Sequence, residues 1–173
     1  MKVAVLTMFC GLSSTYSLVN VVADQIEMLL RANIQVKVLV SETCPDQERK
    51  GIFADKRIEW VKIINTYKGA NIAWHDYSSG TGKVHETFFE EAELIAADFV
   101  RHLKDVDVCI LHDILYQGWH LIHNIAIRTA QKELPHLRFL AFTHSLPLNR
   151  PMELEYPFSA RYTPMPRITF VYP

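Results

Sequence analysis

Cysteine and glycine are scarce in this chain, and neither sign of charge predominates. The three cysteines, Cys10, Cys44 and Cys109, lie far apart and show no C-x-x-C spacing, so we expect reduced thiols rather than a disulfide scaffold. Eighteen Lys and Arg residues stand against nineteen Asp and Glu residues, a formal net charge of −1. This balance gives no electrostatic reason to expect nucleic acid as a partner.

Long hydrophobic runs are also missing. Residues 3–23 carry no charge, but the apolar part ends at Cys10, and the rest is interrupted by glycine, serine, threonine and asparagine. A membrane-spanning helix needs about 20 predominantly apolar residues, and a signal peptide needs a small-residue cleavage site. We therefore predict neither a signal peptide nor a membrane span, and a cytoplasmic location.

What is present is an alternation of apolar strands with amphipathic helices in a chain of 173 residues, 49% of them hydrophobic. This length favours one domain. The pattern predicts strands at 3–8, 36–40, 58–64, 106–111, 138–143 and 168–172, and helices at 17–31, 88–103 and 118–132. Strand, helix and strand in succession form βαβ units, which give parallel sheets. We predict an α/β fold: a Rossmann-like open, mostly parallel sheet with helices on both faces.

Polar residues gather where three of the predicted strands end. They are the turn after the first strand, His112-Asp113 after the fourth, and His144-Ser145 after the fifth. In open α/β sheets, ligands bind outside the carboxyl ends of the strands. We therefore expect these three segments to meet at one ligand-binding edge.

The first turn contains Gly11, Ser13 and Ser14 and precedes a helix. It lacks the second and third glycines of the dinucleotide fingerprint G-x-G-x-x-G, and the later segment 80–83 (G-T-G-K) lacks the rest of a P-loop. Backbone N–H groups at a helix start can bind phosphate or sugar hydroxyls. The alternative is an ordinary loop whose hydroxyl side chain caps the helix.

The histidines leave two interpretations open. His144, at the end of an apolar strand, could hydrogen-bond a sugar hydroxyl or polarise a reacting group, or it could be a satisfied, partly buried side chain. The same alternatives apply to His112 and Asp113. His120 and His123 lie three residues apart on a predicted helix, but a third ligand with zinc-like spacing is not evident, and we predict no metal. We interpret Trp119, Leu121, Ile122 and Ile125 as a core stripe.

Four segments resemble a known family. They are K-V-A-V-L-T-M-F-C-G-L-S-S-T-Y-S at the start, then Q-V-K-V-L-V-S-E, V-D-V-C-I-L-H-D and L-A-F-T-H-S. Together they resemble the N-terminal domain of retaining glycosyltransferases of the GT-B fold, family 4. In that family the N-terminal domain chiefly binds the acceptor and a C-terminal domain binds the nucleotide-sugar donor.

The resemblance implies roles for individual residues. Gly11 would lie near the donor phosphates and the acceptor, and His144 would match a histidine that contacts the transferred sugar. His112 and Asp113 would line the acceptor side. Ser13 and Ser14, by their place in the first turn, and Ser145, by its place after the fifth strand, are predicted as further substrate-binding residues. The chain has one glycine in the first loop where the family often has two, and the family's E-x7-E signature and its donor domain are absent.

The resemblance therefore leads to one functional prediction over residues 1–173. They would form the acceptor-binding half of a glycosyltransferase that needs no cofactor. Its partners would be a nucleotide-sugar donor and a hydroxyl acceptor, with peripheral membrane association where the acceptor is a lipid. The alternatives are a stand-alone, flavodoxin-like binding or regulatory module, and a small nucleotide- or phosphate-binding enzyme that is complete in itself.

Overall fold

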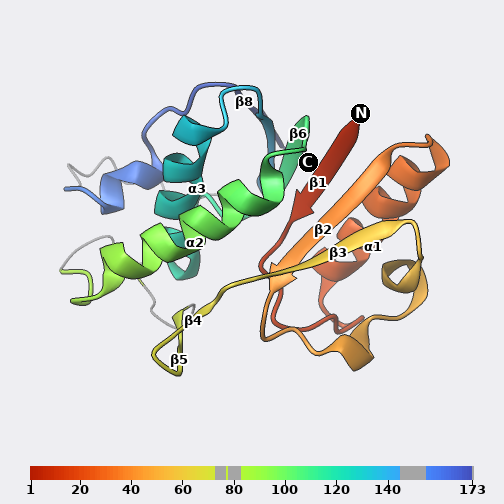
Figure 1. The fold of residues 1–173 in the computed structure, drawn as a ribbon, viewed down its shortest axis with the longest axis horizontal. Coiled ribbons are helices and arrows are strands. Elements are labelled where there is room, and N and C mark those ends of the chain that lie inside the picture. The colour runs from red at the N-terminus through yellow and green to blue at the C-terminus, as the bar shows by residue number, and fades with distance from the viewer. Residues whose placement is uncertain (73–76, 78–82, 145–154, 173) are drawn as a thin grey trace.

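The computed structural model describes residues 1–72, 77, 83–144 and 155–172. Its centre is a six-stranded sheet, which has helices packed on its faces (Figure 1). All five pairs of neighbouring strands are parallel. The strands are β1 (Lys2–Leu6), β2 (Gln35–Ser41), β3 (Ile58–Ile63), β6 (Val108–His112), β7 (Arg138–Phe142) and β8 (Ile168–Val171). Each corresponds to a strand predicted from the sequence, within two residues at either end.

The strand order places the chain's reversal between β1 and β6. The order is β3-β2-β1-β6-β7-β8, so the chain moves outward from β1 to β3 and then crosses to β6 and moves outward the other way. In the sheet's own count this is 3-2-1-4-5-6, the order of Rossmann domains. The predicted Rossmann-like sheet is confirmed, and its order differs from the 2-1-3-4-5 order of flavodoxin-like sheets.

Helices cover both faces of the sheet, as predicted (Figure 1). Residues of β1 alternate between the faces, as successive residues of a strand must. Val3 and Val5 pack with α1 (Ser17–Arg31), whereas Ala4 and Leu6 pack with α2 (Phe88–Leu103) and α3 (Leu121–Glu133). Because both faces are covered, β1 is apolar at nearly every position instead of alternating with polar residues.

Two local features differ from the prediction. The helix expected at 118–132 is a 3₁₀ turn, η4 (Gly118–His120), followed by α3. Between the strand predicted at 58–64 and the helix predicted at 88–103, where no strand is predicted, the chain forms a hairpin of β4 (Thr66–Tyr67) and β5 (Ala70–Asn71). Its turn residues, Lys68 and Gly69, both have positive φ, the backbone that a two-residue hairpin turn requires.

Short 3₁₀ turns complete the connections. The β2–β3 connection carries η1 (Asp46–Glu48) and η2 (Gly51–Ala54), and η5 (Phe158–Arg161) precedes β8. Arg128 of α3 donates hydrogen bonds to the carbonyl oxygens of Ala160 and Thr163, which holds the η5 segment against α3. None of the helices in the described part of the chain has the length and apolar character needed to cross a lipid bilayer.

Candidate functional site

A cavity that could hold a ligand lies at the reversal point of the sheet, outside the carboxyl ends of β1 and β6. After β1 the chain leads to α1 on one face, and after β6 it leads to α3 on the other. The loops therefore separate and leave a crevice, where ligands bind in open α/β sheets. The cavity has a volume of about 380 Å³. We call it the switch-point pocket.

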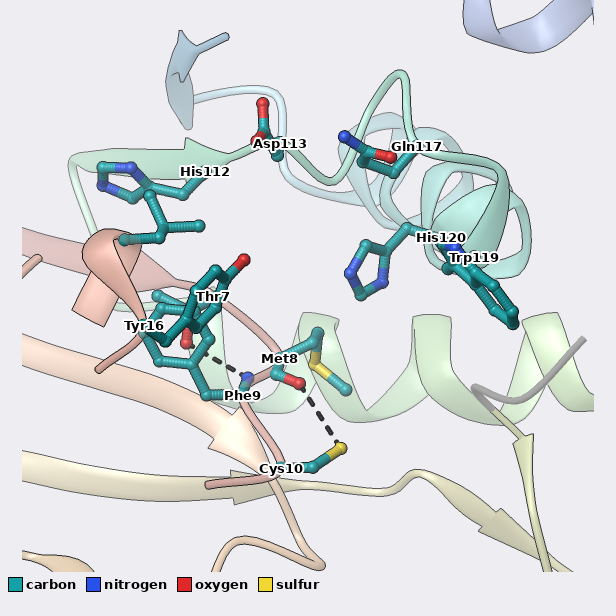
Figure 2. Close-up of a pocket in the computed structure, with 11 residues that line it drawn as sticks. Thr7, Met8, Phe9, Cys10, Tyr16, His112, Asp113, Gln117, Trp119 and His120 are labelled. Atoms are coloured by element: carbon teal, nitrogen blue, oxygen red, sulfur yellow. Dashed lines mark hydrogen bonds between the residues drawn. The ribbon is translucent and has the colours of Figure 1, made fainter. Parts of the chain in front are cut away.

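Two loops and the start of α1 line the switch-point pocket (Figure 2). The β1 side contributes Thr7, Met8, Phe9 and Cys10, with Tyr16 and Leu18 at the start of α1. The β6 side contributes His112, Asp113, Gln117, Trp119 and His120. Asp113 is the one formally charged side chain in this described lining, which contains no lysine or arginine. Such a surface suits a ligand with hydroxyl or amino groups better than a phosphate.

Aromatic rings are unusually exposed at this pocket. Tyr16 is 51% exposed and Trp119 is 45% exposed, although large aromatic side chains usually bury most of their area. The Tyr16 ring is held in place by an edge contact with Phe9, at 5.8 Å between ring centroids. Partial burial, and then the Asp113 carboxylate, raise the pKa of the Tyr16 hydroxyl. Its phenol is therefore protonated near neutral pH and able to donate a hydrogen bond.

The backbone is strained at equivalent places on the two central strands. Met8, just after β1, has φ of 53°, and Asp113, just after β6, has φ of 59°. Left-handed backbone costs a residue with a side chain roughly 1–2 kcal/mol. Strain of this kind persists where the surroundings impose it, and it gathers at binding and active sites. Both strained residues line the switch-point pocket.

Asp113 also ties the ends of β6 and β7 together. Its carboxylate Oδ1 accepts a hydrogen bond from the backbone N–H of His144 at 2.8 Å. Its own backbone N–H donates to the carbonyl oxygen of Phe142 at 3.1 Å. The left-handed conformation of Asp113 thus lets one residue engage β7 through both its main chain and its side chain.

A chain of hydrogen bonds runs from His144 through His112 to α1. His112 Nε2 lies 3.0 Å from Gln25 Oε1, and His112 Nδ1 lies 3.0 Å from His144 Nε2. A carboxamide oxygen only accepts, so His112 Nε2 carries the hydrogen, and its Nδ1 accepts from His144. Burial, and then the neighbouring His144, lower the pKa of His112 to about 4. Near neutral pH, His112 is an uncharged ring that fixes the ring of His144.

A second chain of the same kind ends in the pocket. His120 Nδ1 lies 3.1 Å from His123 Nδ1, and His123 Nε2 lies 3.0 Å from Asn65 Oδ1. His123 and Asn65 are fully buried. Burial lowers the pKa of His120 to about 4, and burial also lowers the pKa of His123 well below its ordinary value. Both rings are therefore uncharged near neutral pH.

The structure brings together some of the predicted site residues and separates others. His112 and Asp113 line the switch-point pocket, and His144 contacts it through His112. Ser13 and Ser14 line a different cavity with Glu48 and Lys50. Ser145 lies outside the described residues.

Gly11 lies close to a side chain of the protein itself. A Cβ added at Gly11 would stand 3.1 Å from Glu48 Oε2, and the same oxygen accepts a hydrogen bond from the Leu12 backbone N–H at 2.6 Å. The Glu48 carboxylate thus occupies a backbone donor of the loop predicted to bind phosphate. The loop after β1 therefore faces two ways: Met8, Phe9 and Cys10 line the pocket, whereas Gly11 and Leu12 lie against Glu48.

Sequence reasoning missed several residues of the pocket. Trp119 does not join the core with Leu121, Ile122 and Ile125, which are buried as predicted; it is exposed at the pocket, and that interpretation was wrong. The reason is that Trp119 lies in the η4 turn, where the phase of α3 does not apply. The spacing of His120 and His123 was a usable signal, although it indicates a hydrogen-bonded pair rather than a pair of metal ligands.

Within the described residues, no group of three or more His, Cys, Asp or Glu side chains is arranged to hold a metal ion. Of the cysteines, Cys10 is exposed at the pocket and Cys44 and Cys109 are buried. Comparisons of this chain with models of protein families, with curated proteins and with solved structures found no match.

Proposed function

We propose that this chain is the acceptor-binding half of a two-domain glycosyltransferase, which transfers a sugar from a nucleotide-sugar donor with retention of configuration. The observation that supports this most is the chemistry of the switch-point pocket. Its described lining offers neutral hydrogen-bonding groups and exposed aromatic rings, and it contains no lysine or arginine. A hydroxyl-bearing acceptor fits this lining, whereas donor phosphates would need cationic groups from elsewhere.

The catalytic contribution of this half would be positioning. Tyr16 and Trp119 offer flat apolar surfaces for a ligand's ring, and Asp113 can accept hydrogen bonds from its hydroxyl groups. Holding a hydroxyl in line with a reacting carbon removes much of the entropy cost of the reaction. Acceptor orientation is thus the first role of the pocket in this proposal.

His144 would act at the edge of the same pocket. Because its Nε2 donates to His112, its Nδ1 is the atom that keeps a lone pair. That nitrogen could accept a hydrogen bond from a hydroxyl of the transferred sugar, and its orientation is fixed by His112 and Gln25. We therefore assign sugar contact to His144 and its positioning to His112.

The test is transfer by the full-length protein with a panel of nucleotide sugars, namely UDP-glucose, UDP-N-acetylglucosamine and GDP-mannose, followed by release of the nucleotide. His144→Ala should lower kcat at least about tenfold. His136→Ala is the matched control, because His136 is an exposed histidine beyond the end of α3. Equal transfer by His144→Ala and His136→Ala would remove the role given to His144. Ligand binding without transfer by the full-length protein would favour the binding-module alternative.

A further inference from the structure

The second histidine chain fixes which atom of His120 faces a ligand. It begins at Asn65, whose side-chain Nδ2 donates to Asn71 Oδ1 at 3.0 Å. That bond orients the Asn65 amide, so its oxygen, Oδ1, is the atom that meets His123. Asn65 lies just beyond β3 and Asn71 lies in β5, so the hairpin missed by the sequence prediction sets this orientation.

The hydrogens along the chain follow from the oxygen of Asn65. An amide oxygen only accepts, so His123 Nε2 must carry a hydrogen, and the neutral ring then has its lone pair on Nδ1. The 3.1 Å contact between the two Nδ1 atoms is a hydrogen bond only if His120 Nδ1 donates. A neutral His120 then has its lone pair on Nε2, the ring nitrogen that takes no part in the hydrogen bonds linking Asn65, His123 and His120.

Position and electrostatics keep that lone pair available. His120 lines the switch-point pocket, and Figure 2 shows its ring projecting from the start of α3 toward the β1 loop. Burial lowers the pKa of His120 to about 4 and also lowers that of His123. The positive end of the α3 dipole, which lies at these residues, disfavours an imidazolium further. Asp113 acts in the opposite direction as a smaller influence.

We propose that His120 Nε2 is a fixed hydrogen-bond acceptor of the switch-point pocket, and that it selects ligands presenting an O–H or N–H group there over phosphorylated ones. His120 is the binding residue, and His123 and Asn65 are positioning residues. This inference rests on the proposed function in one respect: the selected ligand would be the sugar acceptor.

The chemistry of a phosphate explains the selection. A phosphate dianion only accepts hydrogen bonds, so it would meet the His120 lone pair without a donor, and the described lining has no lysine or arginine to attract it. A neutral or amino sugar offers a donor to His120. His120 is also too weak a base to remove a proton near neutral pH, so its loss should raise KM more than it lowers kcat.

The first experiment reads the hydrogens directly in the 173-residue chain. Proton–nitrogen correlation spectra of isotope-labelled histidine at neutral pH should show His120 protonated on Nδ1 and His123 on Nε2. The variant Asn65→Asp should reverse the outer ring, because a carboxylate stabilises the His123 imidazolium, which then donates to His120 Nδ1 and leaves the hydrogen on His120 Nε2. A wild-type His120 that is protonated on Nε2, or charged, overturns the proposal.

The second experiment measures ligand selection with three probes that share one ring: glucose, glucosamine and glucose 6-phosphate. Each is titrated at millimolar concentration while the signals of His120 and Trp119 are followed. Glucose and glucosamine should bind at least about tenfold more tightly than glucose 6-phosphate, and Asn65→Asp should weaken glucose about tenfold. His136→Ala should bind all three probes as the wild type does.

The results separate this inference from the proposed function. Glucose 6-phosphate binding as tightly as glucose, or no binding of any probe, overturns the ligand selection. Equal glucose binding by Asn65→Asp and wild type, once the reversed ring has been observed, overturns the role of His120. If the tautomers and the selection are as expected but the full-length protein transfers no sugar, the proposed function fails while the binding site stands.

Discussion

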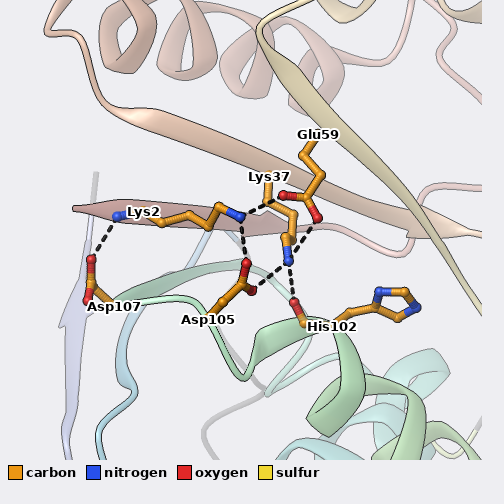
Figure 3. A network of polar contacts seen from close by, with 6 residues as sticks. All are labelled: Lys2, Lys37, Glu59, His102, Asp105 and Asp107. Atoms are coloured by element: carbon orange, nitrogen blue, oxygen red, sulfur yellow. Dashed lines mark hydrogen bonds and ion pairs between the residues drawn. The ribbon is translucent and has the colours of Figure 1, made fainter.

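The two edges of the sheet bury polar groups in opposite ways. At the amino edge, Lys2 and Lys37 each contact the carboxylates of both Glu59 and Asp105, at 2.6–3.0 Å (Figure 3). Lys37 is only 3% exposed and also donates to the carbonyl oxygen of His102 at 2.7 Å. At the carboxyl edge, the buried side chains of the two histidine chains, namely His112, His123 and Asn65, are uncharged.

This difference separates a structural cluster from a candidate binding site. At the amino edge, the buried Lys37 and the partly buried Lys2 are compensated by opposite charge from the protein itself, so little capacity is left for a ligand. At the carboxyl edge, the buried histidines are uncharged and hydrogen-bonded, so they need no opposite charge beside them. In each pair of histidines the outer ring, His144 or His120, keeps a lone pair. The left-handed Met8 and Asp113 and the exposed rings of Tyr16 and Trp119 lie at this second edge.

The largest expected difference between the two edges is the effect of acid on their contributions to the free energy of unfolding. The pKa of His112 is lowered from 6.5 to about 4, so between these values the unfolded chain binds a proton that the folded chain does not. The free energy of unfolding should therefore fall by roughly 3 kcal/mol from this residue alone as the pH drops from 6.5 to about 4. Urea unfolding across this range measures the loss, and His112→Gln should reduce it. Parallel pH profiles for the variant and the wild type would contradict the comparison.

The amino edge should resist acid longer. Hydrogen bonds from Lys2, and then from Lys37, hold the pKa of the Asp105 carboxyl below its ordinary range. The stability gained from this ionised carboxylate is thus complete above its ordinary pKa of about 4, and it is lost as the pH falls below that value. The two edges should therefore contribute to acid unfolding in successive pH ranges.

Removing one partner from the lysine cluster should have the next largest effect. Asp105→Asn leaves the buried Lys37 with less compensation, and we expect a loss of about 2–3 kcal/mol in the free energy of unfolding, below the range for fully buried pairs because Asp105 is half exposed. Lys37→Met removes the buried charge itself and should cost less. Urea unfolding measures the free energy of unfolding of both variants. An equal loss in both would show that the uncompensated charge of the buried Lys37 ammonium is not the main cause of the loss in Asp105→Asn.

The sheet could be predicted from the sequence because the local spacing of apolar residues indicates each strand and helix. The residues Val3 to Leu6 form an apolar run, and α2 has apolar residues at helical spacing, so their positions follow without knowledge of partners. The pocket depends on contacts between distant segments. His123 is hydrogen-bonded to Asn65, and His112 to Gln25. The partners are far apart in the sequence, so the local spacing of residues does not predict either hydrogen bond.

The lysine cluster was unpredictable for a related reason. Lys37 interrupts an apolar strand, which marks it as unusual, but its partners Glu59 and Asp105 lie on β3 and after α2. Only the strand order, with β2 between β1 and β3, brings these charges together.

Truncating the exposed rings should affect ligand binding without affecting stability. Because Trp119 is 45% exposed, Trp119→Ala should change the free energy of unfolding by less than about 1 kcal/mol, while raising KM for the acceptor of the full-length protein about tenfold. Met28→Ala is the matched control, since Met28 is 61% exposed on α1 and does not line the pocket. A KM equal to that of the control would place the acceptor away from these rings.

The smallest effect is expected at Gly11, which lies beside the pocket but faces the protein's own carboxylate. Its φ is not in the left-handed region, so Gly11→Ala should gain about 0.4–1 kcal/mol by restricting the unfolded chain. The new Cβ would press on Glu48 Oε2 and weaken its bond to Leu12, a cost of similar size. We expect a net change within about 0.5 kcal/mol in urea unfolding and an unchanged KM for both substrates. A large loss of transfer at unchanged stability would instead show that the loop binds the donor, with Glu48 displaced, and would join the two halves of the β1 loop into one site.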